Sequence, residues 1–469
     1  MNEHENRILI RGGTLITPDG CFPGDVALED ESIVAVGAGL RMPDSFNVVD
    51  ARGCIVLPGL IDCHTHIALD TGIYKTADDW EIGTRTAACG GITTVIDYAT
   101  QFHGQTLKQA LENRWAEADG RACIDYALHC MVTDLPRDRE IELGDLVRLG
   151  VPSVKLYTTY RPNYYADDDA ILRLLRASAS AGLLVTTHCE NDALVTAATA
   201  DLVARKQTTW RYHARGRPAL AEHEAIHRVL FLAQAARAPV YIVHCSTGRS
   251  VELVRQARGH GQMAFAETCL QYLLLDDSCY NSEHPERFIL QPPLRDQADK
   301  AVLWQLIAEG AVSTIATDHC DYTLAQKIAV NDFTRTPGGL PGMETLLPLL
   351  YTYSIVEGRL TWDQLARLAA ANPARIFGLY PRKGILAPRA DADVVIFDPQ
   401  GVGTIQAGQL HNIAGYTPYE GMRVQGHVKM TIARGQIVCE EGEFKGAPGR
   451  GRFVAGEPFD ADRFQQHVA

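Results

Sequence analysis

Short apolar segments alternate with amphipathic segments from about residue 58 to about residue 380, and this alternation constrains the fold most strongly. The apolar segments have the length and composition of β-strands; they are ITTVIDYA, DYALHCMV, SVKLYT, LLVTTHCE, VYIVHCS, MAFAET and AVSTIATD. Amphipathic helices are predicted between them, at DDWEIGTRTAAC, DDDAILRLLRASASAG, EHEAIHRVLFLAQAARA and QADKAVLWQLIAEG. Alternation of this kind over such a length predicts a (β/α)8 barrel.

Both ends of the chain show short alternating strands with turn signals instead. Residues 1–57 contain RILIRGGTLITPDG and DVALEDESIVAVGAG, and the segments ADVVIFDP and GHVKMTIARGQIVCEEGEF follow residue 383. We expect residues 1–57 and 383–454 to form one small β-sandwich domain beside a catalytic barrel of residues 58–382. Residues 455–469 have the composition of a polar C-terminal tail.

Charge and cysteine usage restrict the partners and the compartment. The formal net charge of −13 disfavours nucleic acid or an anionic membrane as a partner. No apolar run approaches the ~20 residues that a membrane helix needs, and the charged start MNEHENRILIRGG is not typical of a signal peptide. The 12 cysteines include no CxxC pair, which favours reduced thiols and a cytoplasmic protein.

Metal-binding side chains stand at the ends of several predicted strands. In GLIDCHTHIALD, His64 and His66 are two residues apart, so on a strand both imidazoles face one side. One such pair alone is more often structural. However, His188, His244 and Asp318 end three further predicted strands, and the active sites of such barrels lie at the carboxyl ends of the strands. Imidazole and carboxylate together suit first-row metal ions, so the sequence predicts a metal centre.

Lys155 lies in the middle of the apolar strand VPSVKLYTTY. A buried ammonium group needs a partner or must lose its charge, and desolvation lowers the pKa of a lysine. The neutral amine can add carbon dioxide to give a carbamate, whose two oxygens can bridge two metal ions. For a lone lysine, a head group that reaches solvent and forms a salt bridge is the better interpretation. Ligands at four other strand ends favour the carbamate here.

These motifs together resemble the dihydropyrimidinase/hydantoinase family of cyclic amidohydrolases. The resemblance extends over nearly the whole chain. It rests on PGLIDCHTH, TADDWEIGTRTAACGGITTVIDYA, SVKLYTTY, THCEN, RYHARGRPALAEHEAIHR, YIVHCS, AETCLQYLLLD, QPPLR, ATDHC, PGGLPGMET, YTPYEGMRVQGHV and GRGRFV.

The resemblance implies two divalent metal ions per subunit, with zinc favoured. The implied ligands are His64, His66 and Asp318 for the more buried ion, His188 and His244 for the second, and N6-carboxylated Lys155 as a bridge. A hydroxide held between the ions would attack a ring amide carbonyl. Asp318 would act as general acid/base and Tyr160 would donate to the oxyanion. The substrate would be a hydantoin or dihydropyrimidine, the product an N-carbamoyl amino acid, and the assembly a homotetramer.

The chain departs from the family pattern around the expected substrate pocket. LDTGIYK stands where hydantoinases carry an apolar Met-Pro-Phe run, so we expect Leu69 and Tyr74 to line the pocket and Asp70 and Lys75 to make it more polar.

Two further substrate-binding positions also differ from the family. Gln291 and Gly338 replace a serine and an asparagine that act through their backbone, and the glutamine would crowd the ring. Asp321 replaces a proline after Asp-His-Cys, and His319 is expected to pack beside the site without binding metal.

Other polar residues near these motifs are expected to be structural. Several cysteines adjoin the ligands, and because neighbours on a strand face opposite ways we expect them in the layer between barrel and helices; they are Cys63, Cys189, Cys245 and Cys320. An internal ion pair between Arg217 and Glu222 is a further expectation.

Single positions and motifs separate this chain from proteins of the same fold with other functions. Dihydroorotases carry an arginine two residues after the histidine pair, where this chain has Ala68. An allantoinase-like hydrolase of another cyclic ureide stays as an alternative. A non-catalytic assembly protein of the same fold is the alternative from another class, and metal content would separate it from an enzyme.

Overall fold

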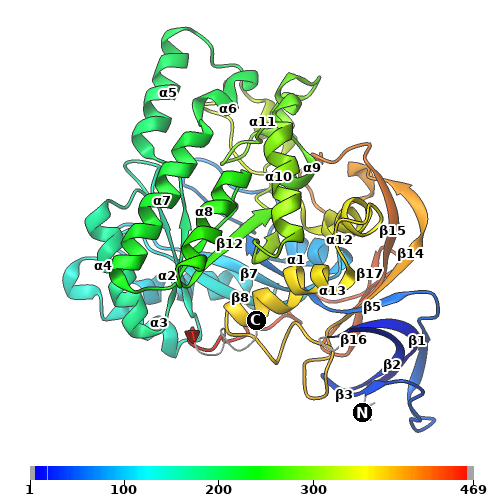
Figure 1. Cartoon of the computed structure of the whole chain (residues 1–469). Helices are drawn as coiled ribbons and strands as arrows, with labels where there is room; N and C mark the ends of the chain where they lie inside the picture. The colour runs from blue at the N-terminus through cyan, green and yellow to red at the C-terminus, as the bar shows by residue number, and fades with distance from the viewer. Residues whose placement is uncertain (1–5, 18–19, 462–469) are drawn as a thin grey trace.

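The computed structural model describes residues 6–17 and 20–461, which form a helix-clad barrel and a separate mixed sheet (Figure 1). The barrel sheet contains eight parallel strands in sequence order. They are β6 (Leu60–Thr65), β7 (Ile92–Thr100), β8 (Asp125–Met131), β9 (Ser153–Tyr157), β10 (Leu184–His188), β11 (Val240–Ile242), β12 (Ala264–Cys269) and β13 (Thr314–Ala316). A bridge between Thr65 and His319 joins the two edges of the sheet. The predicted barrel is therefore confirmed.

Helices follow the barrel strands and cover the outside of the sheet (Figure 1). The longer ones are α1 (Trp80–Cys89), α2 (Leu107–Ala118), α3 (Glu142–Arg148), α4 (Asp168–Ala181), α5 (Asp192–Ala204), α7 (Ala219–Ala236), α8 (Gly248–Gly259) and α10 (Gln297–Ala308). The shorter ones are α6 (His213–Gly216), α9 (Leu270–Leu274), α11 (Leu324–Ile328), α12 (Leu346–Leu350), α13 (Trp362–Ala366) and α14 (Asn372–Ile376).

Helix α4 shows how local sequence sets these boundaries. The Asp167 side chain accepts the backbone N–H of Ala170, which satisfies one of the free donors at the helix start. The helix ends at Gly182, whose φ of 77° is left-handed and costs glycine little. Ile171 and Leu175, four residues apart, are buried on the same helical face, so the amphipathic pattern in the sequence becomes packing against the barrel.

The two ends of the chain pair with each other in the second sheet. Its strand order is β17-β16-β15-β14-β5-β1-β2-β3, with β4 beside β1. The strands are β1 (Arg7–Thr17), β2 (Gly20–Glu29), β3 (Ser32–Gly37), β4 (Asn47–Asp50), β5 (Ile55–Pro58), β14 (Val394–Thr404), β15 (Arg423–Ala433), β16 (Gln436–Glu440) and β17 (Glu443–Phe444). Antiparallel pairing of β5 with β14 joins the two ends, which lie side by side as blue and orange strands in Figure 1.

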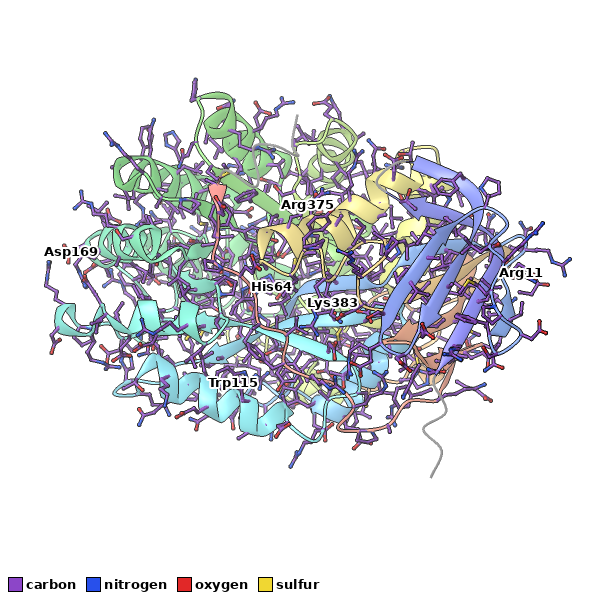
Figure 2. The ribbon with its side chains drawn as sticks, turned by 90° about the horizontal axis from the view of Figure 1, so that it is seen from below. Arg11, His64, Trp115, Asp169, Arg375 and Lys383 are labelled. Atoms are coloured by element: carbon purple, nitrogen blue, oxygen red, sulfur yellow. The ribbon has the colours of Figure 1, made fainter. Side chains whose placement is uncertain are left out.

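A buried ion cluster joins this sheet to the barrel. Lys383 Nζ lies 2.7 Å from a carboxylate oxygen of Asp125 on β8 and 2.7 Å from one of Asp393, just before β14 (Figure 2). Arg434 Nε donates to the other Asp125 oxygen at 2.9 Å. Removing one partner from a buried ion cluster costs about 3–5 kcal/mol, so these charges hold the two sheets in one relative position.

The described part of the C-terminal segment lies against the barrel. The backbone N–H of Glu457 donates to the Gly378 carbonyl at 2.9 Å, and that of Phe459 donates to the Gly182 carbonyl at 2.8 Å. The rest of the predicted tail, residues 462–469, lies outside the described residues.

Within residues 6–17 and 20–461, the structure contains no helix with the length and apolar character of a membrane span.

Candidate active site

A cavity with a volume of about 560 Å³ opens at the carboxyl ends of the barrel strands. The predicted metal-ligand, catalytic and substrate-binding residues all line it; these are His64, His66, Leu69, Tyr74, Lys155, Tyr160, His188, His244, Gln291, Gly338 and Asp318. They come from seven separate stretches of sequence, and the barrel brings them together. In Figure 2, His64 lies in the middle of the barrel.

His64, His66 and Asp318 converge on a common point. The Nε2 atoms of both histidines lie 3.3 Å from Asp318 Oδ1. The simple strand argument is incomplete here, because β6 ends at Thr65 and its pairing with β7 shifts register just before that point. Asp318 itself has a left-handed φ of 51°. These local irregularities aim three side chains at one position, and the ligand atoms lie within 4.8 Å of one another.

Lys155 lies beside this group at the centre of the cavity. It is 1% exposed, and its Nζ lies 3.3 Å from His64 Nε2 and 4.6 Å from the ring centre of Tyr98. Burial lowers the pKa of Lys155 to about 8, which increases the fraction of neutral amine at neutral pH. The rings of His188 and His244, from the two adjacent strand ends, pack edge to face with centres 4.6 Å apart.

Two buried glutamates orient the histidines, and the sequence analysis missed both. Glu267 Oε1 lies 2.6 Å from His64 Nδ1, and Glu190 Oε2 lies 2.7 Å from His188 Nε2. Burial raises the pKa of Glu267 to about 7. A carboxylate on one ring nitrogen directs the other nitrogen toward a metal. The sequence does carry a signal for Glu267, because it is a charged residue within the apolar strand MAFAET, just as Lys155 is a charged residue within its own apolar strand.

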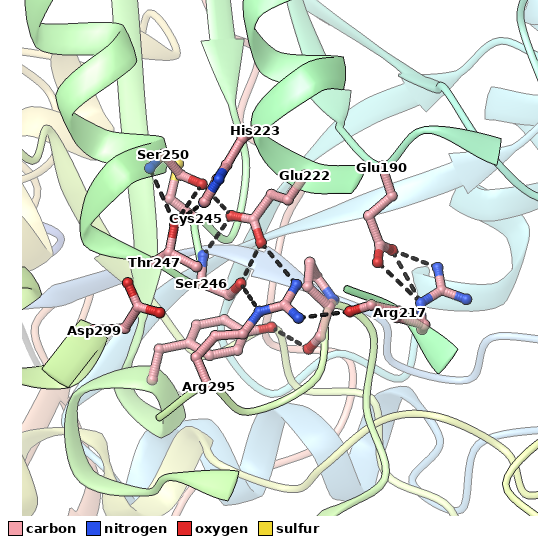
Figure 3. A network of polar contacts seen from close by, with 12 residues as sticks. Glu190, Arg217, Glu222, His223, Cys245, Ser246, Thr247, Ser250, Arg295 and Asp299 are labelled. Carbon is pink, nitrogen blue, oxygen red and sulfur yellow. Dashed lines mark hydrogen bonds and ion pairs between the residues drawn. The ribbon is translucent and has the colours of Figure 1, made fainter. Parts of the chain in front are cut away.

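The prediction of an ion pair between Arg217 and Glu222 is wrong. Arg217 Nε donates to Glu190 Oε1 at 3.0 Å, whereas Arg295 Nη2 donates to Glu222 Oε2 at 3.1 Å (Figure 3). Glu222 also accepts the backbone N–H of Ser246 at 2.9 Å. Each arginine therefore meets the carboxylate that approaches it from another part of the chain, a pairing that proximity in sequence does not reveal.

Tyr160 follows β9 and contacts the ring of His188. Its φ of 75° is left-handed, which is unusual for a bulky residue. The centre of the Tyr160 ring lies 5.1 Å from that of His188 and 5.1 Å from the guanidinium carbon of Arg217. Burial raises the pKa of Tyr160, so its hydroxyl keeps the proton and remains a hydrogen-bond donor at neutral pH.

The loop after β6 presents a less polar surface than the sequence suggested. Asp70 and Lys75 form an antiparallel bridge at its base, and both side chains are exposed and absent from the cavity lining. The expectation that they make the pocket more polar is wrong, because the tight turn points them outward. The loop residues that line the cavity are Leu69, Thr71, Ile73 and Tyr74.

The side chain of Gln291 packs directly against Gly338. A Cβ atom added at Gly338 would lie 1.8 Å from Gln291 Oε1 and 2.3 Å from its Cδ. The glutamine amide therefore fills the volume that a side chain at position 338 would take. The two departures from the family pattern form one packed unit at the cavity wall.

Two of the four ligand-adjacent cysteines are not in the layer between barrel and helices. Cys63 Sγ lies 3.5 Å from the Tyr241 hydroxyl, within a cluster of side chains from the barrel strands, and Cys320 lines the cavity. Strand alternation does not apply at either place, because β6 is irregular near Cys63, and Cys320 lies two residues after Asp318 and beyond the end of β13. Cys189 and Cys245 do belong to the large core shared with the helices.

The amidohydrolase family model matches residues 55–438. A D-phenylhydantoinase of Escherichia coli K12 is 42% identical over 457 residues, which cover 97% of this chain and 99% of that protein. A D-phenylhydantoinase of Shigella boydii serotype 4 is equally similar, with the same identity and coverage.

Solved structures of similar proteins agree with this result. The dihydropyrimidinase of Brevibacillus agri superposes with a TM-score of 0.95 at 34% identity, over 97% of this chain and 99% of that one. The L-hydantoinase of Arthrobacter aurescens gives a TM-score of 0.89 at 28% identity, over 96% of this chain and 99% of that one.

Proposed function

Because the chain belongs to the amidohydrolase family, as a cyclic amidohydrolase of the hydantoinase and dihydropyrimidinase type, we propose that it opens the ring of a 5-substituted hydantoin or a dihydropyrimidine. The ring C–N bond breaks, the carbonyl carbon gains the oxygen of water, the nitrogen gains a proton, and an N-carbamoyl amino acid results. The observation that carries the proposal is the convergence of histidine, lysine and aspartate side chains in one cavity.

The donor set in this cavity fits two divalent ions. Glu267 holds His64 Nδ1, which leaves Nε2 facing Asp318, and Glu190 holds His188 Nε2, which leaves the other ring nitrogen for a metal. We assign the sites as the sequence predicted: His64, His66 and Asp318 for one ion, His188 and His244 for the other, and carboxylated Lys155 between them. When bound, the ions would supply a water of lowered pKa and polarise the scissile carbonyl.

The chain's own groups would move the protons and hold the developing charge. Burial opposes ionisation of Asp318, but the neighbouring His64 and His66 outweigh it and lower the pKa of its carboxyl group. Asp318 is thus ionised at neutral pH and could take the proton of the attacking water and return it to the leaving nitrogen. Tyr160 would donate its hydroxyl proton to the oxyanion. Both have left-handed backbones, a strain that concentrates at functional sites.

The shape of the pocket wall supports an apolar ring substituent. Leu69, Ile73 and Tyr74 line the cavity on the side of the loop after β6, while the charged residues of this loop point away. Burying an aryl group against such a wall is favourable, roughly 25 cal/mol for each Å² of apolar surface. We therefore propose a preference for an aromatic substituent on the substituted ring carbon.

Ring opening by metal-loaded protein tests this function. The substrates are 5-phenylhydantoin, hydantoin, dihydrouracil, allantoin and dihydroorotate, each assayed with and without a chelator. We expect chelator-sensitive hydrolysis that is fastest with 5-phenylhydantoin. Hydrolysis of allantoin alone would support the alternative ureide hydrolase, and a protein that neither binds metal nor hydrolyses any substrate would contradict an enzymatic role.

Metal analysis and light scattering of the same preparation test two narrower parts of the proposal. The family resemblance supports zinc as the ion and a homotetramer as the assembly.

Substitutions at Gln291 and Gly338 should have coupled effects on kcat/KM, because the two residues pack against each other. Gly338→Asn alone places its Cβ on the Gln291 amide, so we expect kcat/KM to fall at least about 10-fold, which corresponds to about 1.4 kcal/mol. Adding Gln291→Ser removes the clash and should restore most of the loss. The measurement is a double-mutant cycle in kcat/KM for 5-phenylhydantoin. Gly408→Ala is the matched control, because a Cβ there meets nothing within 4 Å; strictly additive effects would refute the coupling.

A further inference from the structure

A second group of buried metal-ligand side chains lies next to the candidate active site in the chain. It consists of Asp78, just before α1, with His319 and Asp321, both after β13. All three side chains are fully buried, and one ligand atom from each lies within 4.8 Å of the others. None of the three belongs to the proposed ligand set of the catalytic centre.

The spacing within this group is that of ligands around an ion. His319 Nε2 lies 3.6 Å from Asp78 Oδ2 and 3.5 Å from Asp321 Oδ1. Both distances exceed the usual 2.7–3.2 Å of a hydrogen bond. A four-coordinate ion with bonds of about 2.1 Å separates neighbouring ligand atoms by roughly 3.4 Å. The His64–Asp318 and His66–Asp318 distances in the candidate active site are similar, at 3.3 Å.

The remaining polar atoms of the group already have partners. His319 Nδ1 accepts the Gly342 N–H at 3.2 Å, and Asp78 Oδ1 accepts the Ile413 N–H at 2.9 Å. Asp78 Oδ2 and His319 Nε2 have no hydrogen-bond partner and face the same space. In the described part of the chain, no lysine or arginine forms an ion pair with Asp78 or Asp321. His319 can carry at most one positive charge, so the two buried carboxylates are not fully compensated, which is costly.

We propose that Asp78, His319 and Asp321 bind a divalent first-row cation, such as Zn²⁺ or Mn²⁺, in addition to the ions of the catalytic centre. One imidazole and two carboxylates are suitable ligands for such an ion, and a charge of +2 neutralises both carboxylates. Ca²⁺ fits poorly because it takes 6–8 oxygen ligands at longer distances.

This ion would hold the base of the loop that lines the substrate cavity. The Ala68 N–H donates to the Asp78 carbonyl at 2.9 Å, and the Ala77 N–H donates to the Asp321 carbonyl at 2.7 Å. These two hydrogen bonds anchor both ends of the loop between residues 69 and 76. The cation would therefore act structurally, by fixing the wall of the pocket and not by contacting the substrate.

Metal counting on matched variants tests the site. The protein is loaded with excess Zn²⁺, freed of unbound metal, and analysed by mass spectrometry for ions per folded chain. We expect Asp321→Asn to carry one ion fewer than the wild type. Asp79→Asn is the control and should keep the wild-type content, since it changes the neighbouring carboxylate and asparagine caps a helix equally well. His188→Asn, a change in the proposed catalytic centre, should leave the additional ion bound.

Anomalous diffraction from Zn²⁺-loaded wild-type crystals decides the question without any substitution. A peak bonded to His319 Nε2 is the expected result, whether or not the catalytic centre is also filled. Absence of this peak, or unchanged metal content in folded Asp321→Asn, would overturn the proposal and leave a bridging water in the space. Anomalous diffraction reports the position of each bound ion. Failure of the catalytic metal assignment would therefore appear separately, as missing peaks near His64.

Discussion

Lys155→Met is expected to remove at least one metal ion per chain and to lower turnover at least about 10³-fold. Methionine keeps the buried volume but has no amine to carboxylate, so it cannot supply the oxygens and the negative charge of the proposed bridge. A buried methionine is also cheaper to desolvate than the lysine, whose Nζ lies 3.3 Å from His64 Nε2. Loss of metal-dependent charge stabilisation is worth several kcal/mol, and each 1.4 kcal/mol is about tenfold in rate. Metal content and kcat are the measurements.

Lys327→Met is the matched control for this experiment. Lys327 is equally buried, but its Nζ donates to the backbone carbonyls of Ile289 and Pro337, neither of which is a proposed ligand. We expect this variant to keep its metal ions.

In wild-type apoprotein, added bicarbonate should accelerate reactivation by metal. Full metal content and activity in Lys155→Met would eliminate the carbamate bridge.

Asp318→Asn is expected to lower kcat by about 10²–10⁴-fold or more while the protein stays folded. The range is that of a lost general acid/base, to which any loss of metal affinity adds. Asparagine is the sharper substitution, because it tolerates the left-handed φ of 51° at this position better than alanine does. The measurements are kcat with 5-phenylhydantoin, metal content, and the thermal unfolding midpoint.

A carboxylate outside the cavity provides the comparison for Asp318. Asp363→Asn removes a half-buried carboxylate on α13 that pairs with Arg367 and does not line the cavity, and it should leave kcat unchanged. If folded Asp318→Asn turned over 5-phenylhydantoin at the wild-type rate, the acid/base role would have to pass to another group.

The barrel could be predicted because its information is local. Strand and helix periodicities repeat along the chain, and the helix boundaries at Asp167 and Gly182 follow from capping chemistry. Alternation of these elements permits few topologies, and ligand types at strand ends then identify the rim of the barrel as the site. Lys155 was informative for the same reason, since an ammonium group in an apolar strand is energetically unfavourable unless it has a partner or a chemical role.

Other features depend on contacts between distant segments. Glu267 on β12 reaches His64 on β6, Arg217 pairs with Glu190 and not with Glu222, and Gln291 fills the space above Gly338. No periodicity encodes such pairings, because they depend on where closed strands and loops bring side chains together.

The sequence by itself determined the fold class and the kinds of side chain at the rim of the barrel, because both follow from short-range pattern. Only the tertiary structure decided which atoms face one another. It turned Asp70 and Lys75 outward, and it brought Asp78 within reach of His319 and Asp321. The physical reason is that side-chain direction at strand ends depends on register shifts and left-handed residues, which strand alternation does not predict.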